Sequence, residues 1–364
     1  MKKTLAIILA LLILSFSVLT VSAAENGGIN GSNWQSAVDG SLPITAINMP
    51  GTHDSAARYL YFSTRARTQS LSVLQQLYAG VRYLDVRLSL GGNNILAMHG
   101  VLNCKKELGL FAQNLTAKDI VSDCKKFLEQ NPGETILFLL KQEESEKNKK
   151  LFTRFYDELI APSPELWYTK NKIPVLDEVR GKIVLLRVAE ADKSRFGNSN
   201  SGINFETYPY IGSTDMNDFR FQKIISLDKR LLSEPVGYMF VQDSYKIEGE
   251  KKTKVIANFF ADNLSENHFN ICCTNANNIK TPYANAKKVN AFLSSYDFKA
   301  GGVYGIVAMD FATAELCERI YMTNLPSMTN TPNAANSVGY GESYGFLGEL
   351  MLQIRDILLR LTLL

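Results

Sequence analysis

The stretch Val81-Arg-Tyr-Leu-Asp-Val-Arg-Leu88 is an apolar run that carries two charged side chains, Asp85 and Arg87, two residues apart. Alternate residues of a β-strand project to the same face, so this run predicts a strand that presents both charges together. Similar runs recur along the chain, with helical patterns between several of them. We therefore interpret the run as one strand of a repeated strand–helix arrangement.

Short apolar runs, most of them rich in β-branched and aromatic residues, are the predicted strands. They are Ile44–Met49, Val81–Leu90, Ile95–Met98, Thr135–Leu140, Lys182–Val188, Gly237–Val241, Phe269–Cys273 and Gly302–Met309. Helical patterns occupy Thr68–Tyr78, Thr116–Gln130, Lys147–Ile160, Gly249–Leu264 and Ala284–Tyr296. Strands alternating with helices imply a parallel sheet, and this number of strands predicts a single-domain α/β fold, the (β/α)8 TIM-type barrel. The barrel is expected to be irregular, because no clear helix follows the second or the fifth run.

The N-terminus predicts export. Lys2 and Lys3 precede an uncharged apolar stretch, and small residues follow it, which is the layout of a secretory signal peptide. We expect residues 1–24 to be removed by cleavage near Ala23 or Ala24, which makes the mature protein secreted and extracellular. An uncleaved membrane anchor is the alternative.

The mature chain is expected to form a catalytic barrel over residues 25–325 and a tail over 326–364. The tail ends in apolar residues at helical spacing between Leu347 and Leu364. This amphipathic helix is expected to pack on the outside of the barrel. A helix lying on a membrane surface and a contact between oligomer subunits are the alternatives.

Charge and cysteine content exclude several functions. A formal net charge of +3, dispersed along the chain, is too small for a nucleic-acid footprint. Five cysteines leave at least one unpaired if all pairing is intramolecular. His268 with Cys272 and Cys273 lacks the second chelating pair that a structural metal site needs, so we predict no metal there.

Polar residues lie at or just after the C-terminal ends of several predicted strands. The chain has only three histidines, and two of them, His53 and His99, lie in short polar motifs at strand ends. The full set at such positions is His53, His99, Lys141, Arg187, Asp243 and Asp310. Barrel enzymes hold their chemistry at the C-terminal ends of their strands, so we expect these side chains to share one face. Two histidines, an arginine and carboxylates suit acid–base chemistry on a phosphate ester.

The ordered motifs resemble those of bacterial phosphatidylinositol-specific phospholipase C. The catalytic part of the resemblance is Pro50-Gly-Thr-His-Asp-Ser55, Leu84-Asp-Val-Arg87 and Met98-His-Gly100. It extends through Leu139-Leu-Lys-Gln-Glu143, Gly181-Lys-Ile-Val-Leu-Leu-Arg187, Val241-Gln-Asp-Ser-Tyr245 and Gly305-Ile-Val-Ala-Met-Asp310, and covers roughly residues 33–320.

The resemblance implies cleavage of phosphatidylinositol by its own inositol 2-hydroxyl, giving diacylglycerol and inositol 1,2-cyclic phosphate. His53 is then the general base, and Asp310 fixes its tautomer. His99 is the general acid, assisted by Asp54. Arg87 binds the phosphate and stabilises its developing charge.

The resemblance also implies a set of substrate-binding residues. Lys141, Arg187 and Asp243 are expected to bond the ring hydroxyls, Tyr245 to stack on the inositol ring, and Asp85 to orient Arg87. For Arg187 a partly buried structural arginine is the alternative.

Arg87 and Lys141 also bear on the cofactor. Two cations on one face leave little reason for Ca²⁺ to bind, since that ion takes several oxygen ligands. We therefore predict an enzyme without metal or other cofactor. A metal-dependent barrel phosphodiesterase, of the glycerophosphodiesterase or sphingomyelin-cleaving type, and a non-catalytic barrel that binds inositol lipids are the alternatives.

The expected partner is phosphatidylinositol in a membrane surface, which a monomer contacts transiently. Proteins with GPI anchors are a second candidate substrate. Tyr59, Tyr61 and Phe62 follow the first motif, where aromatic side chains at the barrel rim could enter the membrane interface, and core packing is their alternative.

Overall fold

The structure, a computed structural model, describes residues 28–60, 64–108, 111–143, 149–228 and 235–325. The predicted signal peptide, the predicted tail, Tyr61 and Phe62 lie outside these residues. No helix in the described ranges is long and apolar enough to cross a membrane.

Parallel strands form the core of the molecule. Within the described ranges they are β1 (Met49–Thr52), β3 (Tyr83–Gly91), β6 (Ile136–Gln142), β8 (Ile183–Arg187), β9 (Ile203–Asn204), β11 (Pro235–Gln242), β12 (His268–Cys273) and β13 (Ile306–Met309). Hydrogen bonds join β11, β12, β13, β1, β3, β6, β8 and β9 in that order, except between β9 and β11. There β10 (Arg220–Ile225) pairs antiparallel with β11. The fold is an irregular (β/α)8 barrel, as predicted, whose sheet is not closed by hydrogen bonds.

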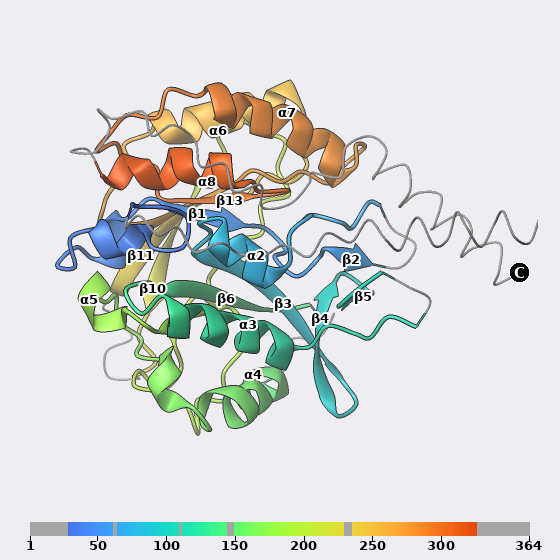
Figure 1. Ribbon diagram of the computed structural model, residues 1–364, viewed down its shortest axis with the longest axis vertical. Helices are drawn as coiled ribbons and strands as arrows, with labels where there is room; N and C mark the ends of the chain where they lie inside the picture. Colours follow the sequence, from blue (N-terminus) through green and yellow to red (C-terminus); the bar gives the residue numbers. More distant parts are fainter. Residues whose placement is uncertain (1–27, 61–63, 109–110, 144–148, 229–234, 326–364) are drawn as a thin grey trace, which may run out of the picture.

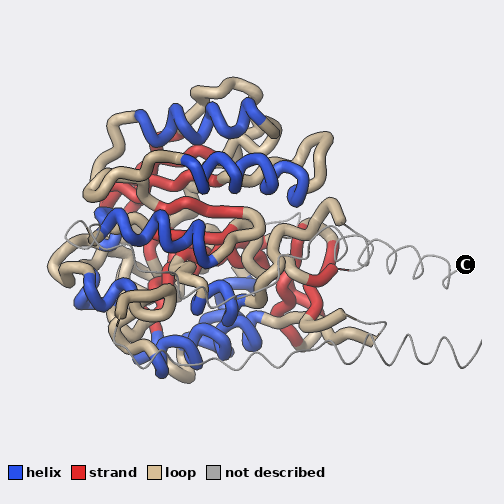
Figure 2. The backbone as a smooth tube through the Cα atoms, turned by 45° about the horizontal axis from the view of Figure 1, so that its top comes forward, coloured by secondary structure: helices blue, strands red, loops and turns tan. Residues whose placement is uncertain are grey.

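Helices cover the outside of the strands (Figures 1 and 2). They are α2 (Val73–Tyr78), α3 (Ala117–Gln130), α4 (Lys150–Phe155), α5 (Leu176–Val179), α6 (Glu250–Ala261), α7 (Pro282–Ser295) and α8 (Ala314–Tyr321). The predicted start of α3 is confirmed, because the Thr116 side chain accepts from Asp119 N while Asp119 accepts from Thr116 N. Four short strands lie off the barrel's parallel path: β2 (Tyr59–Leu60), β4 (Asn94–His99), β5 (Leu102–Lys105) and β7 (Trp167–Tyr168).

Two predicted strands differ from the observed ones. Ile44–Ala46 is a 3-10 turn, and the first strand begins only at Met49. The run Ile95–Met98 lies in β4, which pairs antiparallel with β3 and is therefore no barrel strand. This hairpin explains why no helix follows the second run. The missing parallel strand, β9, comes instead from the long segment after Val188.

The end of the barrel opposite the catalytic motifs is closed by a buried cluster around Trp34. Its ring stacks on Tyr321 with centroids 5.4 Å apart, and its Nε1 donates to Gly80 O at 3.0 Å. Beside it Arg82 and Glu134 form a fully buried ion pair at 2.8 Å. Loss of one member of such a pair typically costs about 3–5 kcal/mol, so this cluster anchors the barrel.

Candidate active site

Strand register brings the predicted polar residues to one end of the barrel. Asp85 and Arg87 lie two residues apart on β3, and Arg87 is level with Lys141 on the neighbouring strand β6. His53 follows β1, where its N–H donates to Met309 O at 3.0 Å, and Asp310 follows β13. Side chains of level residues on adjacent strands share a face, so these groups converge at the C-terminal mouth.

His53 is held between a carboxylate and a guanidinium. Its Nδ1 lies 2.8 Å from Asp310 Oδ1, and its Nε2 lies 2.9 Å from Arg87 Nη2. A guanidinium only donates, so Nε2 is the acceptor and the ring proton sits on Nδ1, directed at Asp310. Burial and the charge of Arg87 hold the pKa of His53 well below its ordinary value. The imidazole is therefore neutral near pH 7, with its free lone pair on the nitrogen that faces the mouth.

Asp54 lies between the two histidines. Its Oδ2 is 3.3 Å from His53 Nε2 and 3.3 Å from His99 Nε2, and the two rings are 6.4 Å apart. His99 Nδ1 lies 2.6 Å from Ala66 O, so this nitrogen carries a proton. His99 Nε2, 3.3 Å from Asp54 Oδ2, is then the ring nitrogen from which a general acid would give its proton.

The backbone and environment of Asp54 are both unusual. Its φ of 43° is in the left-handed region, which turns its side chain back into the site. Burial, opposed by Arg87 and His99, raises the pKa of Asp54 from 3.8 to about 6. The carboxyl group therefore changes charge close to neutral pH, beside the proposed acid.

The Arg87 guanidinium contacts carboxylates of the site. Its Nε is 2.8 Å from Asp54 Oδ1, and its Nη2 is 3.3 Å from Asp85 Oδ2. Lys141 Nζ is also 3.3 Å from Asp85 and lies 4.4 Å from the centre of the Tyr208 ring. Although burial opposes ionisation, Lys141 and Arg87 hold the pKa of Asp85 below its ordinary value. Asp85 is thus a permanent anion that fixes two cations on the floor of the site.

Glu143 is a member of this cluster that sequence reasoning missed. Its Oε1 accepts from Gly100 N at 2.6 Å and lies 3.6 Å from Arg87 Nη1. It therefore links the turn after His99 to the guanidinium. Glu143 lies two residues beyond Lys141, and the alternation of a strand would have placed it on the same face.

Asp243 and Tyr245 follow β11 at the same mouth. Asp243 is buried, and burial raises its pKa against the opposing charges of Lys141 and Lys252. Lys252, on α6, donates to Ser244 O at 3.3 Å and so supports the segment that carries Asp243. Tyr245 is half-buried, and its N–H donates to Asp243 O at 3.0 Å.

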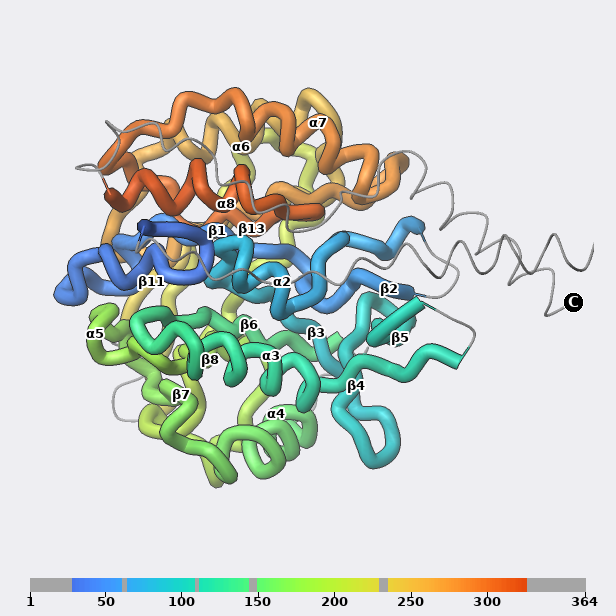
Figure 3. The backbone as a smooth tube through the Cα atoms, viewed as in Figure 1, coloured from blue at the N-terminus to red at the C-terminus, as the bar shows by residue number. Residues whose placement is uncertain are grey.

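The prediction for Arg187 is wrong. Arg187 is level with Leu140 on β6, one residue out of phase with Lys141, so its side chain points out of the barrel. There its guanidinium stands over the Phe152 ring of α4 and donates to Ser201 O, Ala189 O, Glu206 and Asn204. With no exposed surface and four partners, it is a structural arginine. Figure 3 shows β6 and β8 side by side in the barrel.

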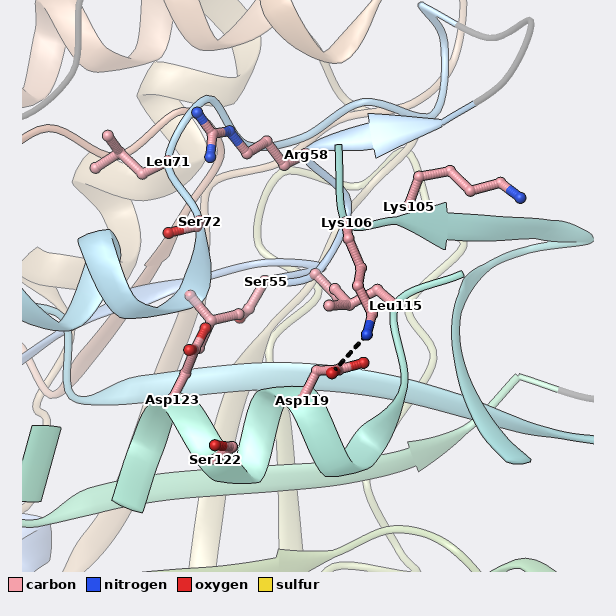
Figure 4. Close-up of a pocket in the computed structure, with 12 residues that line it drawn as sticks. Ser55, Arg58, Leu71, Ser72, Lys105, Lys106, Leu115, Asp119, Ser122 and Asp123 are labelled. Atoms are coloured by element: carbon pink, nitrogen blue, oxygen red, sulfur yellow. Dashed lines mark hydrogen bonds and ion pairs between the residues drawn. The ribbon is translucent and has the colours of Figure 1, made fainter. Parts of the chain in front are cut away.

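A cavity of about 300 Å³ lies behind Ser55, between α2, α3 and β5 (Figure 4). An ion pair between Lys106 and Asp119 at 2.8 Å stands at its wall. None of the residues predicted for catalysis lines it, so this cavity is distinct from the catalytic cluster.

Neither metal ligation nor disulfide bonding is evident in the described part of the chain. It contains no group of three or more His, Cys, Asp or Glu side chains arranged to hold a metal ion. All five cysteines are buried and free, so none of them forms a disulfide.

The chain is similar in sequence to known proteins. The sequence profile of "Phosphatidylinositol-specific phospholipase C, X domain" matches residues 49–188. A 1-phosphatidylinositol phosphodiesterase of Staphylococcus aureus (strain NCTC 8325 / PS 47) is 28% identical over 315 residues, 81% of this chain and 84% of the relative. Another, from Listeria monocytogenes serovar 1/2a, is 30% identical over 201 residues, 52% of this chain and 59% of the relative.

Solved structures agree with the fold. The phosphatidylinositol-specific phospholipase C of Listeria monocytogenes aligns with a TM-score of 0.59 and 25% identity, over 81% of this chain and 99% of that one. The enzyme of Staphylococcus aureus aligns with a TM-score of 0.62 and 23% identity, over 80% of this chain and 97% of that one. The barrel, the paired histidines and these relatives together support a bacterial phosphatidylinositol-specific phospholipase C.

Proposed function

We propose that the protein cleaves phosphatidylinositol to diacylglycerol and inositol 1,2-cyclic phosphate without a metal ion. The observation that carries this proposal is the placement of Asp54 Oδ2 at 3.3 Å from the Nε2 atoms of both histidines, with Arg87 Nε 2.8 Å from the other carboxylate oxygen, Oδ1. Such a cluster offers a base, an acid and an anion-binding cation within one substrate's reach. The matched relatives named above act on phosphatidylinositol by their names, which supports the same substrate here.

The first step follows from the protonation states. Neutral His53 takes the proton of the inositol 2-hydroxyl at Nε2, and the 2-oxygen forms a bond to phosphorus. Asp310, facing Nδ1–H, stabilises the imidazolium that results. Arg87, whose Nη2 lies 2.9 Å from Nε2 in this structure, turns its donors to the phosphate oxygens.

The bond between phosphorus and the glycerol oxygen then breaks. His99 gives its Nε2 proton to this oxygen, so diacylglycerol leaves as a neutral alcohol and the phosphate remains as a cyclic diester. Asp54 Oδ2, 3.3 Å from this nitrogen, orients the His99 ring for the transfer. In this proposal Lys141, Asp243 and Tyr245 bind the inositol ring, and the buried Arg187 does not.

The metal-free part of the proposal rests on charge. Arg87 and Lys141 already neutralise the carboxylates that a divalent cation would need, because both contact Asp85 within 3.3 Å. The positive charge that stabilises the phosphate comes from the guanidinium itself.

Secretion, oligomeric state and a second substrate are part of the same proposal. We infer that the enzyme is secreted after removal of residues 1–24 and works as a monomer on membrane surfaces. GPI anchors contain the same inositol phosphodiester and are proposed as a second substrate. N-terminal sequencing of the secreted protein tests the cleavage, and release of a GPI-anchored protein from cells tests the second substrate.

The activity itself is tested by diacylglycerol release from vesicles of phosphatidylinositol, phosphatidylcholine or phosphatidylethanolamine. We expect release from phosphatidylinositol alone, and its loss in His53→Ala and His99→Ala at nearly unchanged thermal stability. Equal release from phosphatidylcholine, or turnover by His53→Ala close to that of the parent, contradicts the proposal.

A further inference from the structure

The two most exposed large apolar side chains of the described residues lie close to the proposed general acid. Val101 is 93% exposed and Phe111 is 95% exposed. We call the described residues 99–108 and 111–116 the His99 lobe. Figures 1 and 2 show its strands β4 and β5 standing with β2 at one edge of the molecule, beside the barrel.

The lobe is built as a short antiparallel unit. His99 is level with Leu102, so Gly100 and Val101 form the tip of a two-residue turn, and Gly100 has a φ of 57°. At the other end of β5, Lys105 bridges to Asn114, and Lys106 N–H donates to Gln113 O at 3.0 Å. The described residues on either side of Val101, and those from Phe111 to Asn114, thus belong to one antiparallel unit.

The proposed chemistry determines which side of the site faces the lipid. His99 protonates the oxygen that leaves with diacylglycerol, and diacylglycerol is the part of the substrate embedded in the bilayer. The segment that carries His99 must therefore lie next to the membrane when the headgroup is bound. Val101 follows His99 by only two residues.

The lobe carries two lysines, Lys105 and Lys106, and one glutamate, Glu107, and Lys106 is paired with Asp119. Lys105 donates to the side-chain oxygen of Asn114 at 2.6 Å, and Figure 4 shows its side chain extending away from the cavity. Basic groups beside exposed apolar side chains are the usual composition of a surface that docks on anionic membranes. An exposed Phe without lipid would instead leave apolar area in water.

We propose that the His99 lobe is the membrane anchor of this enzyme, with Val101 and Phe111 inserting into a phosphatidylinositol-containing bilayer. This inference rests on the proposed function, because the direction of the bilayer comes from the role of His99. Docking by the lobe presents the general acid directly to the lipid's leaving oxygen.

The test compares Val101→Ser/Phe111→Ser with a matched control, Leu42→Ser. Leu42 is also an exposed apolar residue, at 36%, but it precedes β1 at the opposite end of the barrel, where its carbonyl accepts from Leu176 N. Binding to sucrose-loaded vesicles of phosphatidylinositol and phosphatidylcholine is measured with His53→Ala added to every protein, so that the lipid is not consumed. Turnover of soluble dihexanoyl phosphatidylinositol, below its micelle concentration, is measured with the histidine intact.

The double variant should lose at least about tenfold in vesicle affinity, because burying two such side chains is worth more than one decade in a binding constant. Its turnover of the soluble substrate should stay within about twofold of the parent, and Leu42→Ser should match the parent in both assays. A double variant whose vesicle affinity is within about twofold of the parent overturns the anchor. A parent that binds vesicles but turns over neither substrate overturns the proposed function instead.

A fluorescence measurement locates the contact. The native cysteines are all buried, so an environment-sensitive dye attached to Val101→Cys reports from the lobe alone. A blue shift on adding the vesicles, absent from Leu42→Cys, supports insertion. No shift at Val101→Cys while the protein sediments with vesicles shows that another surface docks and contradicts the proposal.

Discussion

Replacing Asp54 by Asn should stabilise the protein while it damages catalysis. The buried carboxyl group has a pKa raised from 3.8 to about 6, chiefly by its removal from water. A shift of about two units corresponds to about 3 kcal/mol at about 1.36 kcal/mol per unit. Asparagine has nearly the same shape and adopts the left-handed φ of 43° readily, so the backbone is not expected to strain.

The sign of this effect depends on pH. The unfolded chain releases this proton near pH 4, and the folded protein holds it to about pH 6. Between these values the folded state binds more protons, so wild-type stability falls as pH rises, and above pH 6 the whole penalty is present. Asp54→Asn removes the penalty. The variant should match wild type near pH 4 and exceed its unfolding free energy by up to about 3 kcal/mol at pH 7.5.

Urea unfolding followed by tryptophan fluorescence measures this difference, since Trp34 and Trp167 are both buried. Asp119→Asn is the matched control. The pKa of the Asp119 carboxyl, although burial opposes it, is lowered by hydrogen bonds from Lys106 and Thr116, so its loss should destabilise at neutral pH. An Asp54→Asn variant that is less stable than wild type at pH 7.5 refutes the reasoning. It would mean that the ion pairs of Asp54 outweigh its burial.

Three further substitutions separate the roles of the charged residues. Asp310→Asn should lower kcat by about 10²–10⁴-fold, because an amide can reverse the tautomer of His53; kcat close to wild type contradicts that role. Arg87→Lys should be similarly impaired and should not be rescued by calcium, since an ammonium cannot reproduce the forked contact; recovery in calcium would revive a metal mechanism. Arg187→Met should cost about 3–5 kcal/mol of stability by breaking a buried pair with Glu206, and the folded fraction should keep its KM. A raised KM at full stability would restore the substrate-binding role.

The sequence was sufficient for the residues whose position depends only on local rules. His53, His99, Asp243 and Asp310 each end or follow a strand, and Asp85 and Arg87 share a face because strand side chains alternate. The ordered motifs then supplied their roles by resemblance.

The features that the sequence did not reveal depend on how the strands pair with one another. Whether Arg187 points into the barrel is decided by its being level with Leu140 and not with Lys141, which no property of its own segment reveals. The antiparallel direction of β4 likewise depends on the turn that connects it to β3. Asp54 joins both histidines through a left-handed backbone that the sequence did not indicate.

Intramolecular attack in a metal-free site is tested most directly by ³¹P NMR of the purified protein with phosphatidylinositol vesicles in excess EDTA. We expect the resonance of a cyclic inositol phosphodiester to appear as the first product and His53→Ala to abolish it. An open-chain phosphate formed without a cyclic precursor, or product that forms only after calcium is added, would contradict this mechanism.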